Sequence, residues 1–305
     1  MKYRELDLNL LMALDNLVQL RSVSRAADKM AVTQSAMSNM LGRLRDYFDD
    51  PLLVQIGRRM EPTARGLELA EPVRDILVRI EATVRGPSEY DPFTSTRSFT
   101  LMVSDYSLMT VIPEFVQLVA KEAPRVRLNF TPQVMSPGIQ IEQGGADLVI
   151  APAMYCTVDH PSETLLSDRM VCVLDRDNPA QHNFDLATLQ SLEHVVMQPP
   201  SDFESYSIYA LAGVGISMET AIRSYSFASL PALVRGTNRV AVVQTHLARA
   251  LASNGNFVTL PAPVDLEPLE QRMMWHKLQS PDTGIIWLRK KILEAARCLE
   301  ASISQ

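Results

Sequence analysis

Residues 24–38 read Ser-Arg-Ala-Ala-Asp-Lys-Met-Ala-Val-Thr-Gln-Ser-Ala-Met-Ser and carry two short helical patterns separated by a tight turn. Serine hydroxyls offer N-caps to an alanine-rich helix over 25–30, and Thr33 offers a cap to a longer helix over 34–48. Residues 8–20 have an apolar stripe at helical spacing, formed by Leu10, Leu11, Leu14, Leu17 and Val18. The sequence therefore predicts three helices, the last two joined by a very short turn.

The helix over 34–48 has two chemically different faces when its residues are placed about 100° apart. Its inward arc holds Met37, Met40, Leu41, Leu44, Tyr47 and Phe48, and its outward face holds Ser35, Ser38, Asn39, Gly42, Arg43 and Arg45. Small side chains let a helix approach base edges in a DNA major groove, Gln34 or Asn39 can pair bidentately with adenine, and arginines bind guanine or phosphate. The alternative is an ordinary solvated face, although such faces usually carry Glu–Lys pairs.

A longer pattern surrounds this helix. It comprises the runs Leu8-Asn9-Leu10-Leu11, Arg43-Leu44-Arg45, Pro51-Leu52-Leu53-Val54 and Arg59-x-x-x-Thr63-x-x-Gly66. Together with 24–38, these runs resemble the winged helix-turn-helix of LysR-type transcriptional regulators, with Met30 where the family pattern usually has Leu. The residues expected to contact DNA are Ser24, Thr33, Gln34, Ser35, Ser38, Asn39, Arg43, Arg45, Arg58 and Arg59.

Charge is unevenly distributed along the chain. The net charge is −6, which taken alone disfavours nucleic acid, because Lys and Arg drive phosphate binding. Residues 21–65, however, hold eight basic and five acidic side chains, so this segment carries +3 and the remainder carries −9. A basic module attached to an acidic body is typical of a regulator rather than an enzyme.

Residues 52–84 predict a wing followed by a long helix. Residues 52–56 indicate a strand and Gly57-Arg58-Arg59 a hairpin tip, which the resemblance places near the adjacent minor groove. The helix over 63–84 repeats apolar residues at alternating spacings of four and three, through Leu69, Val73, Ile76 and Ile80. This is either a heptad seam or an amphipathic helix packed on its own domain. The resemblance favours a dimerising linker helix, which would present two recognition helices to an inverted repeat.

Beyond Pro92, short apolar runs alternate with amphipathic helices, which predicts an α/β body with mostly parallel sheets. The layout resembles the effector-binding domain of the same family, two α/β subdomains like those of periplasmic binding proteins. The expected fold is thus an α/β multidomain protein. Its expected boundaries are 1–62 for the winged helix-turn-helix, 63–92 for the linker helix and hinge, and 93–305 for the effector-binding domain, with subdomain I at 93–168 and 269–305 and subdomain II at 169–268.

Several short motifs resemble one branch of the family in particular, the activators of nodulation genes and of naphthalene, salicylate and nitroaromatic degradation. The motifs are Tyr90-Asp91-Pro92-Phe93, Arg97-x-Phe99, Ser104-Asp105-Tyr106, Trp275-His276 and Asp282-x-Gly284-x-x-Trp287-Leu288-Arg289. Members of this branch respond to small aromatic compounds. The resemblance therefore implies an activator with a small aromatic inducer, but it does not identify that inducer.

Ligands in open α/β folds bind beyond the carboxyl ends of strands, in the crevice between subdomains. Met and aromatic side chains there offer a polarisable wall for a flat ring, and His246 or Gln198 could bind a phenol or a carboxylate. Each of these residues taken singly is more often part of a core. The expected ligand-binding residues are Ser104, Asp105, Tyr106, Met109, Met135, Met154, Met197, Gln198, Phe203, Tyr206, Phe227 and His246.

Catalytic motifs are missing from the sequence. It has no G-x-S-x-G elbow, P-loop or H-E-x-x-H motif, and its five histidines lack metal-ligand spacing, so we expect no enzyme, cofactor or metal. No long apolar stretch or signal peptide is recognisable, which predicts a cytoplasmic protein without a membrane partner. The expected partners are double-stranded promoter DNA, RNA polymerase, the aromatic inducer and further copies of the chain, as a dimer or a dimer of dimers. The alternative is a cytoplasmic small-molecule-binding protein or enzyme with an N-terminal interaction module.

Overall fold

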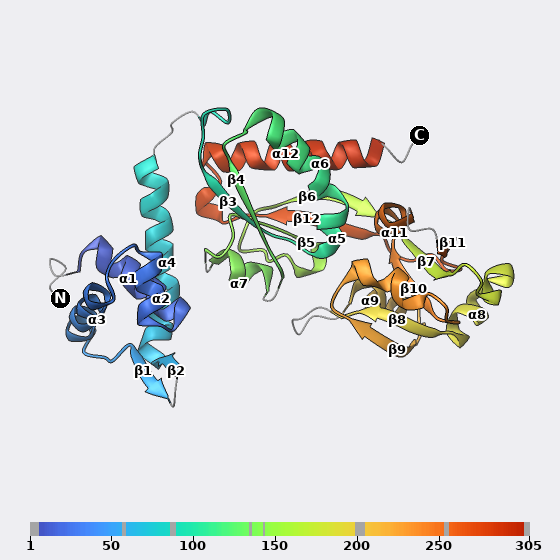
Figure 1. Cartoon of the computed structure of the whole chain (residues 1–305), viewed down its shortest axis with the longest axis horizontal. Coiled ribbons are helices and arrows are strands. Elements are labelled where there is room, and N and C mark those ends of the chain that lie inside the picture. Colours follow the sequence, from blue (N-terminus) through green and yellow to red (C-terminus); the bar gives the residue numbers. More distant parts are fainter. Residues whose placement is uncertain are drawn as a thin grey trace. The chain divides into compact units, whose positions relative to one another are not determined.

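The structure, a computed structural model, describes residues 6–56, 59–85, 90–133, 136–142, 144–198, 205–252 and 256–301. The chain forms two compact units, the first comprising 1–86 and 142–144 and the second comprising 87–141 and 145–305. Each unit is described by itself below (Figure 1).

The first unit contains the helices and the hairpin expected from the sequence. These are α1 (Leu8–Leu20), α2 (Val23–Lys29), α3 (Gln34–Phe48), β1 (Leu53–Ile56), β2 (Arg59–Pro62) and α4 (Ala64–Arg85). Side chains of Asp7, Ser22 and Thr33 cap the first three helices by accepting backbone N–H groups of the first turn. The helices predicted over 8–20 and 34–48 are confirmed with the same bounds.

Helix α4 packs against α1 through the first half of its length. Val73 is 4% exposed within the core of this unit, and the Arg74 guanidinium lies 2.7 Å from the carboxylate of Asp15 in α1. Ile76 is 44% exposed. Part of the predicted heptad seam therefore packs within the unit, as expected for an amphipathic helix packed on its own domain. Ile76, by contrast, faces away from the unit's core.

The second unit is built on two five-stranded sheets. The first sheet has the order β4 (Arg127–Thr131), β3 (Ser98–Met102), β5 (Leu148–Pro152), β12 (Leu269–Met274), β6 (Ser162–Asp168). The second has the order β11 (Phe257–Pro261), β7 (Met170–Asp175), β10 (Val240–Gln244), β8 (Glu193–Met197), β9 (Glu219–Ser224). The chain leaves the first sheet after β6 and returns to it at β12.

Both sheets are mostly parallel, as expected, and each contains one antiparallel strand. In the first sheet β4, β3 and β5 are parallel, whereas β12 is antiparallel to both β5 and β6. In the second sheet β10, β8 and β9 are parallel, whereas β7 is antiparallel to both β10 and β11. The antiparallel strands are those beside each crossing of the chain, where a strand enters a sheet without the helical crossover that a parallel neighbour requires.

The helices of this unit are α5 (Asp105–Met109), α6 (Val111–Glu122), α7 (Pro137–Glu142), α8 (Leu186–Ser191), α9 (Tyr206–Gly213), α10 (Leu230–Val234), α11 (Thr245–Leu251) and α12 (Thr283–Ala301). Helices α6 and α12 lie side by side (Figure 1) and share one hydrophobic core with β3 and β5. Helices α5 and α6 are separated at Thr110, whose hydroxyl donates to the carbonyl of Tyr106 at 2.7 Å.

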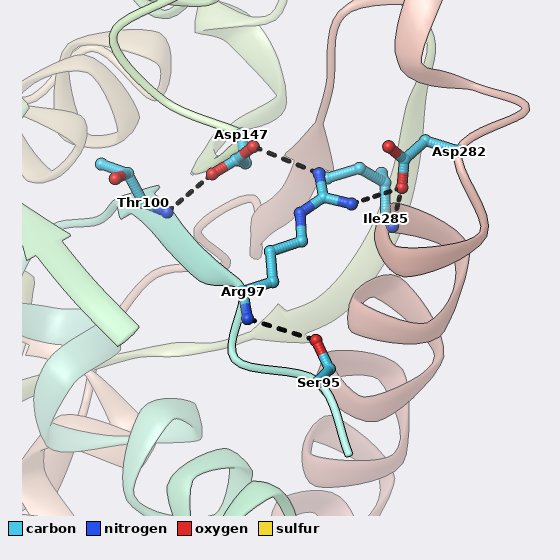
Figure 2. Close-up of polar contacts among 6 residues, drawn as sticks. All are labelled: Ser95, Arg97, Thr100, Asp147, Asp282 and Ile285. Atoms are coloured by element: carbon cyan, nitrogen blue, oxygen red, sulfur yellow. Dashed lines mark hydrogen bonds and ion pairs between the residues drawn. The ribbon is translucent and has the colours of Figure 1, made fainter. Parts of the chain in front are cut away.

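Several of the branch-like motifs meet at the amino ends of β3 and β5 (Figure 2). The Arg97 guanidinium lies 2.7 Å from Asp282 and 3.7 Å from Asp147, and Asp282 also accepts the N–H of Ile285 in the first turn of α12. The backbone N–H of Thr100 donates to Asp147 at 2.8 Å. This arginine cluster, formed by Arg97, Asp147 and Asp282, ties β3, β5 and α12 together.

Candidate DNA-binding face and ligand cavity

The outward face of α3 is exposed as its pattern predicts. Ser35, Ser38 and Asn39 are exposed, while Met37 and Leu44 on the opposite face are fully buried. Thr33 holds the start of the helix, because its Oγ1 accepts the N–H of Ala36 and lies 3.0 Å from the hydroxyl of Ser35. The helix therefore presents short polar side chains at its N-terminal end, where a recognition helix contacts base edges.

The two arginines farther along α3 are placed differently. Arg43 forms an exposed ion pair with Asp7 at 3.3 Å. Arg45 donates from Nε to the carbonyl of Pro51 at 2.8 Å and from Nη2 to that of Leu53 at 2.9 Å. The Arg45 guanidinium thus holds the start of the hairpin against α3, a structural task that the sequence did not suggest.

The hairpin and the start of α2 enclose a basic groove. Arg21, Ser24, Arg25 and Arg59 line it, and Arg21 is paired with Glu61 at 2.6 Å. Of the residues expected to contact DNA, Arg58 lies outside the described residues. The others are all exposed: Ser24, Thr33, Gln34, Ser35, Ser38, Asn39, Arg43, Arg45 and Arg59.

In the second unit, a cavity of about 350 Å³ lies between the two sheets. Residues at the carboxyl ends of β3, β4 and β5 line one side, and residues at the carboxyl ends of β8, β9 and β10 line the other. The wall is largely aromatic and apolar, with contributions from Tyr106, Phe130, Tyr155, Met197, Tyr206, Tyr225 and Phe227. This is where the strand-end rule places a ligand.

The structure brings half of the expected ligand-binding residues to this cavity. The residues that line it are Ser104, Asp105, Tyr106, Met197, Tyr206 and Phe227. Outside its lining lie Met109, Met154, Gln198 and His246, and outside the described residues lie Met135 and Phe203. The prediction did not name Gln133, Tyr225, Gln244 or Gln271. Gln133 and Tyr225 follow strands and Gln244 is the last residue of β10, so the strand-end rule covers all three, whereas Gln271 lies within β12 and had no such signal.

His246 belongs to a buried cluster at the crossing between the sheets. Its Nδ1 lies 2.7 Å from Oδ2 of Asp168, which also accepts the hydroxyl of Tyr106 at 2.8 Å and the backbone N–H of His246 at 3.1 Å. Burial, and then the neighbouring Asp168 carboxylate, raise the pKa of Tyr106 well above its ordinary value. Tyr106 follows the first sheet's β3 and His246 follows the second sheet's β10. We call Tyr106, Asp168 and His246 the crossing cluster.

A second contact joins the two sides of the cavity. The carboxylate of Asp105 accepts the hydroxyl of Ser226 at 2.7 Å and the N–H of Ala228 at 3.1 Å. Asp105 begins α5 beside the first sheet, and the other two residues follow β9 of the second. The start of the short helix α5 is thereby hydrogen-bonded to the opposite subdomain.

The described residues contain no group of three or more His, Cys, Asp or Glu side chains that could hold a metal ion. Among the helices in the described part of the chain, none has the length and hydropathy of a membrane span.

A helix-turn-helix unit followed by a body with a cavity between two α/β subdomains defines a transcriptional regulator that binds a small effector. The family model for the "Bacterial regulatory helix-turn-helix protein, lysR family" matches residues 8–67, and that for the "LysR substrate binding domain" matches 94–297. The chain belongs to the LysR family of transcriptional regulators, which bind DNA and small-molecule effectors and act as oligomers.

The chain is similar to named relatives over nearly its whole length. It is 31% identical over 298 residues to Nodulation protein D 2 of Sinorhizobium fredii, covering 97% of this chain and 96% of that protein. It is 32% identical over 303 residues to Nodulation protein D 1 of Rhizobium meliloti, covering 97% of both chains. A probable transcriptional regulator from Pseudomonas aeruginosa has a similar structure, with a TM-score of 0.69, 28% identity and coverage of 95% of this chain and 97% of that one.

Proposed function

We propose that this regulator activates transcription in response to a small aromatic inducer, which binds in the cavity between the two sheets. The supporting observation is the cavity itself, whose wall combines tyrosine and phenylalanine rings with Met197. Aromatic rings pack on such a surface by stacking and edge contacts, and the methionine thioether adapts to irregular shapes. A volume of about 350 Å³ accommodates a compound of one to three fused or linked rings.

The inducer acts by favouring one arrangement of the two subdomains. A ligand shifts a conformational equilibrium only if its affinity differs between the two states. Tyr106 provides such a difference, because its ring lines the cavity while its hydroxyl is bound to Asp168 in the crossing cluster. A ring packed on Tyr106 therefore favours the arrangement in which these contacts are intact.

DNA binding is assigned to the exposed face of α3 and to the hairpin, with base contacts from Gln34 and Asn39 and phosphate contacts from Arg59 and the neighbouring arginines. Two copies would present two such faces to an inverted repeat. For the dimer contact we propose the side of α4 that carries Ile76, because this residue of the predicted seam is 44% exposed. RNA polymerase is the proposed partner of the DNA-bound oligomer, in the cytoplasm.

The test is DNA footprinting with the purified full-length chain on the intergenic DNA beside its gene, with competitor DNA, over a salt series, and with aromatic compounds. We expect selective, salt-sensitive protection whose pattern shifts with one class of compound. Asn39→Ala should weaken operator preference by about 1–3 kcal/mol. The control Gln190→Leu, an exposed position on α8, should have no effect. A folded protein that binds small molecules but no DNA selectively would support instead a small-molecule-binding protein with an N-terminal interaction module.

A further inference from the structure

The described lining of the cavity contains an acidic side chain but no basic one, which is unusual for a site that binds an aromatic acid. Among the described residues that line it, none is Lys, Arg or His, and the single charged side chain is the carboxylate of Asp105. The described lining of the cavity therefore offers no cationic side chain to an anion.

An ionised carboxylate entering this cavity would lose water without gaining a counter-charge. Moving a charge from water into an apolar site is strongly unfavourable unless the charge is paired. Asp105 adds repulsion, because its own carboxylate is held in place by Ser226 and Ala228. An uncharged compound carries neither penalty.

The polar groups that remain for recognition are neutral. The hydroxyl of Tyr106 is bound to Asp168, and that of Tyr206 donates to the carbonyl of Pro268 at 2.9 Å, so both tyrosines offer their rings rather than their hydroxyls. Gln244 and Gln271 also line the cavity and are 1% and 3% exposed. The side-chain oxygen of each has no hydrogen-bond partner among the described residues.

An amide buried with an unfilled acceptor is a poor arrangement unless a ligand completes it. Each amide presents either its oxygen or its nitrogen after a half-turn about its terminal bond, so a hydroxyl, which donates and accepts, suits both orientations. Gln244 comes from the second sheet and Gln271 from the first. A hydroxylated ring bound to both would connect the two subdomains directly.

We propose that the inducer is an uncharged, hydroxyl-bearing aromatic compound, and that Gln244 and Gln271 are the residues that select it. This inference rests on the proposed function, since it concerns the same cavity, and it decides between the phenol and the carboxylate that the sequence left open.

The test compares matched compounds on three scaffolds of increasing size, binding to the full-length protein at pH 7. Phenol, 2-naphthol and 4-phenylphenol are each set against their methyl ether and against the carboxylate on the same ring system. At this pH the phenols are neutral and the carboxylates are ionised. On at least one scaffold we expect the hydroxyl compound to bind about tenfold or more tightly than either partner, because an unmet hydrogen bond and an unpaired charge are both penalised.

Two variants assign the selection to the glutamines. Gln244→Leu and Gln271→Leu should bring the affinities of the hydroxyl and methoxy compounds to within about twofold of each other, since the ring contacts remain. Gln190→Leu, on the exposed side of α8, should keep the wild-type ratio. Circular dichroism and ligand-free operator binding establish that each variant is folded. If neither leucine variant folds, the wild-type comparison of the three compound classes still decides the charge preference, and Gln244→Met and Gln271→Met replace them.

The outcomes separate this inference from the proposed function. A carboxylate that binds as tightly as the matched phenol and shifts the footprint overturns the neutral-ligand inference and leaves an aromatic inducer in place. Leucine or methionine variants that keep the full preference for hydroxyl overturn the role of the glutamines. Failure of every compound to bind, while selective DNA binding persists, overturns the aromatic inducer and this inference together.

Discussion

Two clusters of charged and polar groups, one largely and one fully buried, lie at opposite ends of the first sheet. The arginine cluster sits at the amino ends of β3 and β5, where Arg97 meets Asp147 and Asp282. The crossing cluster lies at the carboxyl end of β6, beside the ligand cavity. There Asp168 accepts a hydrogen bond from Tyr106 and contacts the ring of His246. Their chemistry is similar, because in each one central charged group satisfies several partners.

The difference lies in which parts of the molecule each cluster connects. The arginine cluster links β3, β5 and α12, which all belong to subdomain I, so it holds one body together. The crossing cluster links a helix beside the first sheet to a helix beside the second. We infer that the arginine cluster mainly stabilises subdomain I, and that the crossing cluster couples the arrangement of the two subdomains to ligand binding. Four substitutions test that division.

Arg97→Leu should have the largest effect. The side chains of Asp147 and Asp282 are 21% and 13% exposed, so removal of the guanidinium leaves two largely buried carboxylates without their shared cation. We expect the free energy of unfolding to fall by about 3–5 kcal/mol, measured by urea denaturation. Arg239→Leu is the control, because its pair with Glu193 is 31% and 49% exposed and should contribute less than about 1 kcal/mol. Equal losses for both variants would contradict a stabilising role for the arginine cluster.

Asp168→Asn should lower stability less but change the response to ligand. The Asp168 side chain is fully buried, and the amide that replaces it keeps the shape while losing the charge that accepts the Tyr106 hydroxyl and the His246 N–H and lies beside the His246 ring. We expect a loss of about 2 kcal/mol in unfolding free energy. The inducer-dependent shift of the DNA footprint should disappear while ligand-free DNA binding persists. A variant that retains the full shift would remove the crossing cluster from the response.

Gly284→Ala tests the arginine cluster without removing a charge. A Cβ at this position would lie 2.5 Å from Nη1 of Arg97, 3.1 Å from Asp282 and 3.2 Å from the Tyr90 ring, so the ion pair must shift. We expect a loss of about 1–2 kcal/mol in thermal or urea denaturation, with an unchanged response to ligand. Gly213→Ala is the matched control, because nothing lies within 4 Å of its added methyl. Comparable stability of the two variants would indicate that the cluster adapts to the methyl group.

The sequence predicted well those features that depend on neighbouring residues. The bounds of α1 and α3 follow from an apolar stripe and, for α3, from the Thr33 cap, so the exposed polar face of α3 was also foreseen. The strand-end rule selected most of the loops around the cavity. The chain leaves the first sheet after β6, which ends at Asp168, and re-enters it at β12, which begins at Leu269.

Features that depend on distant residues were not predictable in the same way. Strand β6 was missed because Ser162–Asp168 has little apolar content of its own and is positioned by pairing with β12. His246 looks like a ligand group in sequence, since nothing there indicates that Asp168 lies next to it. The motif around Arg97 resembles that of one branch of the family, and the structure adds that Arg97 connects β3 and β5 to α12.

Tyr106→Phe should have the smallest effect on stability and the clearest effect on coupling. It removes one hydrogen bond to Asp168 but keeps the ring that lines the cavity, so we expect a loss of about 1 kcal/mol in unfolding free energy. Because the folded-state pKa of Tyr106 is raised above its usual value of 10.0, this contribution should be fully present below pH 10 and decline as the pH rises further. Denaturation of both proteins between pH 7 and 11 measures that difference.

The same variant separates binding from response. Ligand affinity should change little, since the ring remains, whereas the footprint shift should weaken, because the ring is no longer fastened to the crossing. Tyr209→Phe on the exposed side of α9 is the control and should alter neither quantity. If Tyr106→Phe weakens binding and response in equal proportion, the hydroxyl serves only to hold the cavity wall. In that case only Asp168 and His246 of the crossing cluster would couple the two subdomains.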